Sequence, residues 1–183
     1  MIDLTDINRI KSKGRCLFKK EEIEAAIKKV AAQMKEKVGN ETPLFLVVMN
    51  GAVIFAGQLA TCLEFPAQFD YIHATRYHGE IESSDLHWVA EPRAKIKGRT
   101  VVIVEDILDT GLTLAECVKY CESKGAAAIY TAALVDKNRP RAPEGVQKTD
   151  FTGLHVEDKF LFGYGLDYKE FLRNEPGIYA VED

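Results

Sequence analysis

The 183-residue sequence lacks several features that mark special classes of protein. No apolar run approaches the roughly 18 residues that a membrane-spanning helix needs, and the first residues do not resemble a signal peptide. Lysine and arginine are outnumbered by aspartate and glutamate, so the net charge is −4 and no general attraction to nucleic acid or to an anionic membrane is expected. We therefore expect a cytoplasmic protein that binds neither a membrane nor nucleic acid.

Cysteine is also scarce, with only Cys16, Cys62, Cys117 and Cys121. None of them forms a Cys-x-x-Cys pair, so neither a zinc site nor a disulfide framework is indicated. Cys117 and Cys121 lie on one side of a predicted helix. A redox pair is one interpretation of this spacing, and two small buried helix residues are the simpler one.

What the sequence does contain is a regular alternation of apolar strands and amphipathic helices. The composition is typical of one globular domain with a substantial core. Strands that alternate with helices predict an α/β fold with a central, mainly parallel sheet flanked by helices. The predicted helices cover residues 21–38, 52–63 and 110–124, and the predicted strands cover 44–49, 67–75, 101–104 and 126–135.

Two segments depart from this alternation. Residues 76–93 are polar and acidic without a clean period, and they predict a long functional or mobile loop. After Val135, a basic loop with prolines leads to short strand-like runs near positions 151, 160–164 and 178–181. We expect a single domain over 1–183, with a core of about 20–135 and a small hood formed by 136–183 together with the N-terminal segment.

The stretch VVIVEDILDTGLTL, residues 101–114, joins a buried strand to the start of a helix. Ligands of open parallel sheets bind beyond the carboxyl ends of the strands, where Glu105 and Asp106 lie. The first N–H groups of a helix have no partner within the helix and attract a phosphate, and Gly111 lets the backbone come close. Carboxylates suit ribose hydroxyls and Mg²⁺. The unit predicts a sugar-phosphate site; the alternative is an acidic turn in which Asp109 caps the helix.

The same stretch resembles the phosphoribosyl pyrophosphate signature of the type I phosphoribosyltransferases. The resemblance extends over most of the chain and is closest to the hypoxanthine-guanine phosphoribosyltransferases of purine salvage. DKFLFGYGLDY (158–168) resembles their purine-binding segment, LVDKNRPR (134–141) the stretch with a base-recognising lysine, VVMNGA (47–52) the pyrophosphate loop and ATRYHGE (74–80) the start of a mobile catalytic loop.

The resemblance implies the type I phosphoribosyltransferase fold and a Mg²⁺-dependent enzyme. Such an enzyme makes IMP and/or GMP from hypoxanthine or guanine and 5-phosphoribosyl 1-pyrophosphate and releases pyrophosphate. The family usually forms dimers or tetramers, so a homo-oligomer is expected. Two alternatives share the fold: a transferase that prefers xanthine, and a nucleic-acid-binding regulator that senses phosphoribosyl pyrophosphate. The net charge and the lack of a helix-turn-helix extension disfavour the regulator.

For the sugar and the metal, the resemblance assigns the ribose hydroxyls and Mg²⁺ to Glu105 and Asp106, with Asp167 near a second metal position. Asp109 lies where the family places the group that takes up the proton of purine N7. The 5-phosphate is assigned to the segment made of Asp109, Thr110, Gly111, Leu112 and Thr113.

For the purine, the resemblance assigns the 6-oxo group to Lys137, the stacking ring to Phe160, backbone contacts to Leu161 and a position near the base to Asp167. An ammonium has only donors, so Lys137 disfavours adenine, whose 6-amino group is also a donor. Without the resemblance, Lys137 reads as a solvated surface charge and Phe160 as a core residue.

For the leaving group, the resemblance assigns pyrophosphate contacts to Asn50, Gly51 and Arg173. The loop at Asn50 is one where the family often has a non-proline cis peptide, and where many relatives carry lysine or arginine. A salt bridge on a helix face is the alternative for Arg173. Tyr77 is the candidate for closing the mobile loop over the reacting centre, which would exclude water.

Overall fold

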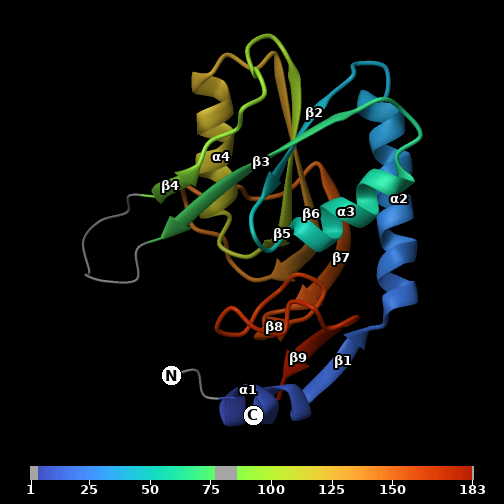
Figure 1. Ribbon diagram of the computed structural model, residues 1–183, viewed down its shortest axis with the longest axis vertical. Coiled ribbons are helices and arrows are strands. Elements are labelled where there is room, and N and C mark those ends of the chain that lie inside the picture. Colours follow the sequence, from blue (N-terminus) through green and yellow to red (C-terminus); the bar gives the residue numbers. More distant parts are fainter. Residues whose placement is uncertain (1–3, 77–85, 183) are drawn as a thin grey trace.

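A computed structural model describes residues 4–76 and 86–182 of the protein (Figure 1). Its main sheet has six strands in the order β4-β3-β2-β5-β6-β7. Neighbouring strands run parallel, except that β3 and β4 are antiparallel. The strands are β2 (Leu44–Val48), β3 (Gln68–Arg76), β4 (Leu86–Ala90), β5 (Thr100–Leu108), β6 (Ala128–Asn138) and β7 (Phe151–Glu157).

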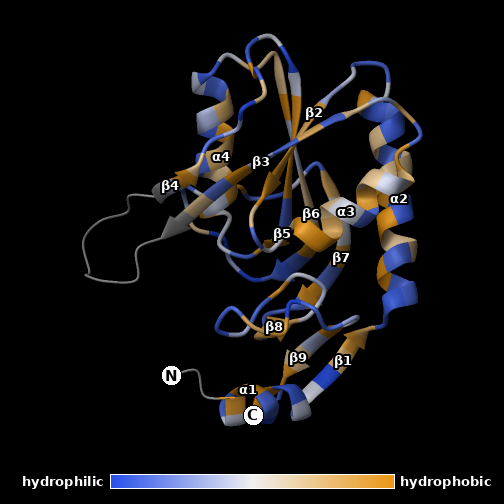
Figure 2. Ribbon diagram, viewed as in Figure 1, coloured by the Kyte–Doolittle hydropathy of each residue, from blue (hydrophilic) through white to orange (hydrophobic). Residues whose placement is uncertain are grey.

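Helices cover both faces of this sheet. α2 (Lys20–Val38) and α3 (Val53–Cys62) pack on one face, and α4 (Leu112–Ser123) packs on the other (Figure 1). Phe45 of β2 belongs to the core on the α2–α3 side, and Leu44 and Leu46 belong to the core on the α4 side. Figure 2 shows the resulting apolar stripes on the helices. Burial on both faces is why β2 and the start of β5 are continuous apolar runs rather than alternating ones.

The predicted α/β class with a mainly parallel central sheet is confirmed. Two details of the prediction are wrong. Residues 86–90 of the segment expected to be a loop form β4, which pairs with the edge strand β3. The strand near Phe151 was assigned to the hood, but β7 extends the main sheet beside β6. Phe151 and Val156 are buried in the core under α2, which explains why this strand joins the main sheet.

A second, smaller sheet lies beyond one end of the main sheet (Figure 1). It has the antiparallel order β1-β9-β8, from β1 (Gly14–Phe18), β9 (Ile178–Val181) and β8 (Leu161–Phe162). α1 (Leu4–Ser12) contributes Ile7 and Ile10 to a small core with Phe162 and Leu172. The assignment of this sheet as a functional hood stays a prediction.

The cysteines are free thiols, and Cys117 and Cys121 are buried on α4. Burial raises the pKa of Cys121 to about 11 and also raises that of Cys117. Thiolate formation is therefore disfavoured at neutral pH, which supports packing rather than redox chemistry. In the part of the chain that the structure describes, no helix is long and apolar enough to cross a membrane.

Candidate active site

A pocket of about 460 Å³ lies beyond the carboxyl ends of β2 and β5. Four segments that are distant in the sequence line it: the end of β2 with its following turn, Ala74 of β3, the end of β5 with the first turn of α4, and a turn that precedes β9. The sequence-predicted residues in the lining are Asn50, Gly51, Glu105, Asp106, Asp109, Thr110, Gly111, Thr113, Asp167 and Arg173.

Glu105 and Asp106, which we name the acid pair, are both buried at the end of β5. Burial raises the pKa of Glu105 well above its ordinary value, and the neighbouring Asp106 carboxylate raises it further. Burial also raises the pKa of Asp106, although the positive charge of Arg173 partly opposes this effect. The pair therefore favours ligands that supply positive charge or hydrogen-bond donors.

The turn after β2 approaches the acid pair closely. The Met49–Asn50 peptide bond is cis. A Cβ atom on Gly51 would lie 1.9 Å from Asp106 Oδ2, and one on Gly165 would lie 2.2 Å from the Gly51 carbonyl oxygen. These separations are far below van der Waals contact, so the turn can pack against both segments only because glycine occupies both positions.

The N-terminus of α4 faces the same pocket. Gly111 is its N-cap, with a φ of 78° and no side-chain hydrogen bond to the helix. Asp109 does not cap α4, so the alternative interpretation of the acidic turn is wrong. Thr110 and Thr113 line the pocket. The Leu112 side chain does not, so a phosphate contact from this residue would use its backbone.

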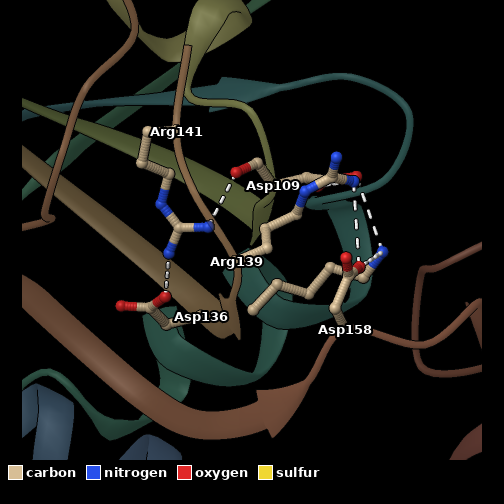
Figure 3. A network of polar contacts seen from close by, with 6 residues as sticks. Asp109, Asp136, Arg139, Arg141 and Asp158 are labelled. Carbon is tan, nitrogen blue, oxygen red and sulfur yellow. Dashed lines mark hydrogen bonds and ion pairs between the residues drawn. The ribbon is translucent and has the colours of Figure 1, made fainter. Parts of the chain in front are cut away.

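The Asp109 carboxylate lies in a group of ionic contacts, which we name the Asp109 cluster (Figure 3). Arg139 Nη1 donates a hydrogen bond to Asp109 Oδ1 at 3.0 Å. Lys137 Nζ lies 3.6 Å from Asp109 Oδ2 and 3.4 Å from Asp158 Oδ1. Arg139 Nη1 also lies 3.8 Å from Asp158 Oδ1. Two acids and two cations thus meet at the end of β6.

The backbone of Asp109 is held separately, by Arg141. Arg141 Nη1 donates to the Asp109 carbonyl oxygen at 2.7 Å, and its Nη2 donates to Asp136 Oδ1 (Figure 3). The Arg141 side chain is buried. Arg141 therefore joins the turn after β5 to β6.

The candidate purine residues have different surroundings. Lys137 is buried, which contradicts a solvated surface charge. Phe160 is 51% exposed, which contradicts a core residue, and its ring meets that of Tyr168 edge-on at 5.6 Å. Leu161 is buried in β8. Tyr77 lies outside the described residues.

Arg173 forms ion pairs in a turn rather than on a helix face. Its Nη2 lies 2.9 Å from Asp167 Oδ1 and 3.1 Å from Glu170 Oε2. Its Nη1 donates to the Gly165 carbonyl oxygen at 2.7 Å. These contacts fix Arg173 beside the acid pair.

A magnesium ion fits this pocket only in company with a substrate. Within residues 4–76 and 86–182, no three His, Cys, Asp or Glu side chains are grouped so that they could hold a metal ion. However, Mg²⁺ in enzymes of phosphate esters is commonly held by one or two carboxylates, while phosphate oxygens and water supply the other ligands. The acid pair provides such carboxylates.

Sequence reasoning missed Arg139, Arg141 and Asp158 as functional candidates. The signal was the basic run at 137–141, from which only Lys137 was selected. Nothing in that run distinguishes the arginine that reaches a carboxylate from one that reaches solvent.

Comparison with known proteins identifies the family. The model of the phosphoribosyl transferase domain matches residues 16–169. This chain belongs to the phosphoribosyltransferase family. Among the curated members, the hypoxanthine-guanine phosphoribosyltransferase of Aquifex aeolicus is 34% identical over 173 residues, which cover 93% of this chain and 96% of the relative. The hypoxanthine-guanine-xanthine phosphoribosyltransferase of Tritrichomonas foetus is 31% identical over 169 residues, or 92% of each chain.

Solved structures of phosphoribosyltransferases share the fold. A crystal structure of a hypoxanthine phosphoribosyltransferase from Staphylococcus aureus has a TM-score of 0.86 at 26% identity and covers 100% of this chain and 96% of its own. The expectation of a type I phosphoribosyltransferase fold is confirmed.

Proposed function

We propose that this phosphoribosyltransferase makes IMP and/or GMP from hypoxanthine or guanine and 5-phosphoribosyl 1-pyrophosphate, with release of pyrophosphate. The observation that carries the proposal is the single pocket that combines the buried acid pair with the N-terminus of α4. One end of this pocket suits the two ribose hydroxyls, which are donors, and the other suits the 5-phosphate. The names of the relatives supply the substrate class.

The pyrophosphate would lie between the turn at Asn50 and Gly51 and the guanidinium of Arg173. Asn50 carries no charge, so Arg173 supplies the positive side chain on this side of the pocket. Glu105 and Asp106, together with phosphate oxygens, would hold Mg²⁺, and Asp167 would act beside a second ion. The bound metal would neutralise charge that develops on the leaving pyrophosphate.

During transfer, a nitrogen of the base forms a bond to the anomeric carbon while the bond to pyrophosphate breaks. The attacking base loses a proton, and the Asp109 carboxylate at the pocket wall would take it up. General-base assistance of this kind typically contributes about 10²–10⁴ in rate.

The purine would lie on the Lys137 side of Asp109, against Phe160 and the backbone of Leu161. Lys137 would donate to the 6-oxo group. Its position on a buried strand end supports this role, because a buried ammonium that meets a second donor leaves that donor without a partner.

The test is a turnover assay with phosphoribosyl pyrophosphate and Mg²⁺ across hypoxanthine, guanine, xanthine and adenine. We expect turnover with hypoxanthine or guanine and the poorest turnover with adenine. Efficient use of adenine would overturn the assignment of Lys137, and no turnover with any oxopurine would overturn the proposed function.

Xanthine use is a second candidate, because the similar Tritrichomonas protein is named as a hypoxanthine-guanine-xanthine enzyme. The same assay decides it. By contrast, the relatives described above are named as transferases, and none of those names supports a nucleic-acid-binding regulator. We also propose that the protein acts in the cytoplasm as a homo-oligomer, whose size sedimentation would measure.

A further inference from the structure

The Asp109 cluster contains one cation, Arg139, to which neither the motifs nor the proposed reaction gives a task. Arg139 follows β6 in the basic loop, and its side chain is 36% exposed. It nevertheless makes the shortest contact to the Asp109 carboxylate, at 3.0 Å, against 3.6 Å for Lys137. Each oxygen of the carboxylate therefore faces a different cation.

This pairing opposes the proposed task of Asp109. The hydrogen bond from Arg139 occupies Oδ1, which an incoming N–H group of the base would need. As the side chains stand, Arg139 and the base compete for one carboxylate.

A second acceptor for Arg139 lies next to the first. Asp158 Oδ1 is 3.8 Å from Arg139 Nη1, and the Asp158 side chain is 49% exposed. A small side-chain rotation would let the guanidinium leave Asp109 and bond to Asp158 without passing through a fully unpaired state. Lys137, which already contacts both acids, can keep its place during this exchange.

We propose that Arg139 is a positioning residue that bonds to Asp109 while the base site is empty and transfers to Asp158 when the purine binds. The inference rests on the proposed function, since it assigns the displaced Oδ1 to the proton of the base. Asp158 accepts the hydrogen bond of Arg139 once the purine has displaced Arg139 from Asp109, which keeps the free-energy cost of that displacement small. Binding of the base is therefore weakened by the contact that the base must replace.

The experiment measures KM for hypoxanthine and kcat at saturating phosphoribosyl pyrophosphate and Mg²⁺. In Arg139→Gln the competing cation is gone, so we expect KM to fall about three- to fivefold, as for loss of a partly exposed ion pair, while kcat changes by less than about twofold. Arg139→Lys keeps the charge and should stay near the unaltered KM. A rise in KM or a large fall in kcat for Arg139→Gln would overturn the inference.

A substitution of Asp158 tests the proposal a second time. Asp158→Asn removes the alternative acceptor, so KM should rise about two- to threefold. In the double variant Arg139→Gln/Asp158→Asn this effect should vanish, because no guanidinium needs a new partner. An equal effect of Asp158→Asn in both backgrounds would show that Asp158 acts through Lys137 instead, and would also overturn the inference.

Two controls separate the possible failures. Lys35→Gln removes another exposed ion pair, Lys35 with Glu64, neither of which lines the pocket, and should leave KM unchanged. Thermal unfolding of every variant reports whether the fold persists. Turnover by the unaltered protein reports on the proposed function, so its absence overturns that proposal, whereas normal turnover with unchanged KM in Arg139→Gln overturns only the role of Arg139.

Discussion

Two groups of acids at the end of β5 have opposite surroundings. The acid pair, Glu105 and Asp106, is buried, and its pKa values are raised by that burial. Asp109 is only three positions further on, but it is partly exposed and has Lys137 and Arg139 at its two oxygens. Burial dominates at the acid pair, where the charge of Arg173 offsets it only in part, whereas each oxygen of Asp109 already faces a cation. Neighbouring residues of one motif can therefore require opposite changes on binding.

The largest effect is expected at Asp109, to which the proposed function assigns proton transfer. Asp109→Asn cannot take up the proton of the base, so kcat with hypoxanthine should fall by about 10²–10⁴. The acid pair is unchanged, so calorimetry with Mg²⁺ and phosphoribosyl pyrophosphate should still detect binding of the sugar. Asp158→Asn is the matched control from the same cluster and should lose much less. Unchanged turnover in Asp109→Asn would remove Asp109 from the mechanism.

A smaller effect is expected where the turn after β2 meets the acid pair. In Gly51→Ala the new methyl group overlaps Asp106 Oδ2, so the free energy of unfolding should fall by about 1–3 kcal/mol. Binding of phosphoribosyl pyrophosphate should weaken as well. The control is Gly57→Ala in α3, where a Cβ meets no atom within 4 Å and helix propensity should stabilise the protein by about 0.5–1 kcal/mol. Denaturant unfolding of both variants measures the difference, and equal stabilities would contradict the close approach at Gly51.

The smallest effect is expected on the way in which the free energy of unfolding changes with pH. Because the pKa values of the acid pair are raised above their ordinary 4.5 and 3.8, the folded state holds these protons more tightly than the unfolded state does. Their stabilising contribution is complete below the ordinary pKa values and is lost as the pH rises through the raised ones. The loss is at most about 1.4 kcal/mol per pH unit for each group.

Glu105→Gln removes one of these titrations. Without ligand, this variant should lose less stability between about pH 5 and pH 8 than the unaltered protein does, as denaturant unfolding at several pH values would show. Glu36→Gln, on the exposed face of α2, should keep the unaltered dependence. If the free energy of unfolding changed with pH in the same way in Glu105→Gln and in the unaltered protein, the acid pair would be excluded as the source of the pH dependence.

The predictions from sequence succeeded where a local pattern determines the structure. The apolar stripe of residues 21–38 predicted α2, and the apolar runs at 44–49 and 101–104 predicted β2 and the start of β5. The predictions failed where pairing with another strand decides the local structure. β4 is a short run inside a segment that is polar and acidic as a whole, and it becomes a strand by pairing with β3, whereas β1 pairs with β9 across almost the whole chain.

The sequence by itself determined the alternating strands and helices from α2 to β6 apart from β4, the family, and the acids and glycine at the end of β5, because periodicity and motif spacing are local properties of a chain. Only the tertiary structure decided which charges meet. Arg139, Arg141 and Asp158 lie 30 or more positions from Asp109. The two arginines follow β6, which pairs with β5, and Asp158 follows β7, which pairs with β6. The energy of an ionic contact depends on distances of a few ångströms and on exposure to water, and neither is encoded in the spacing of residues along the sequence.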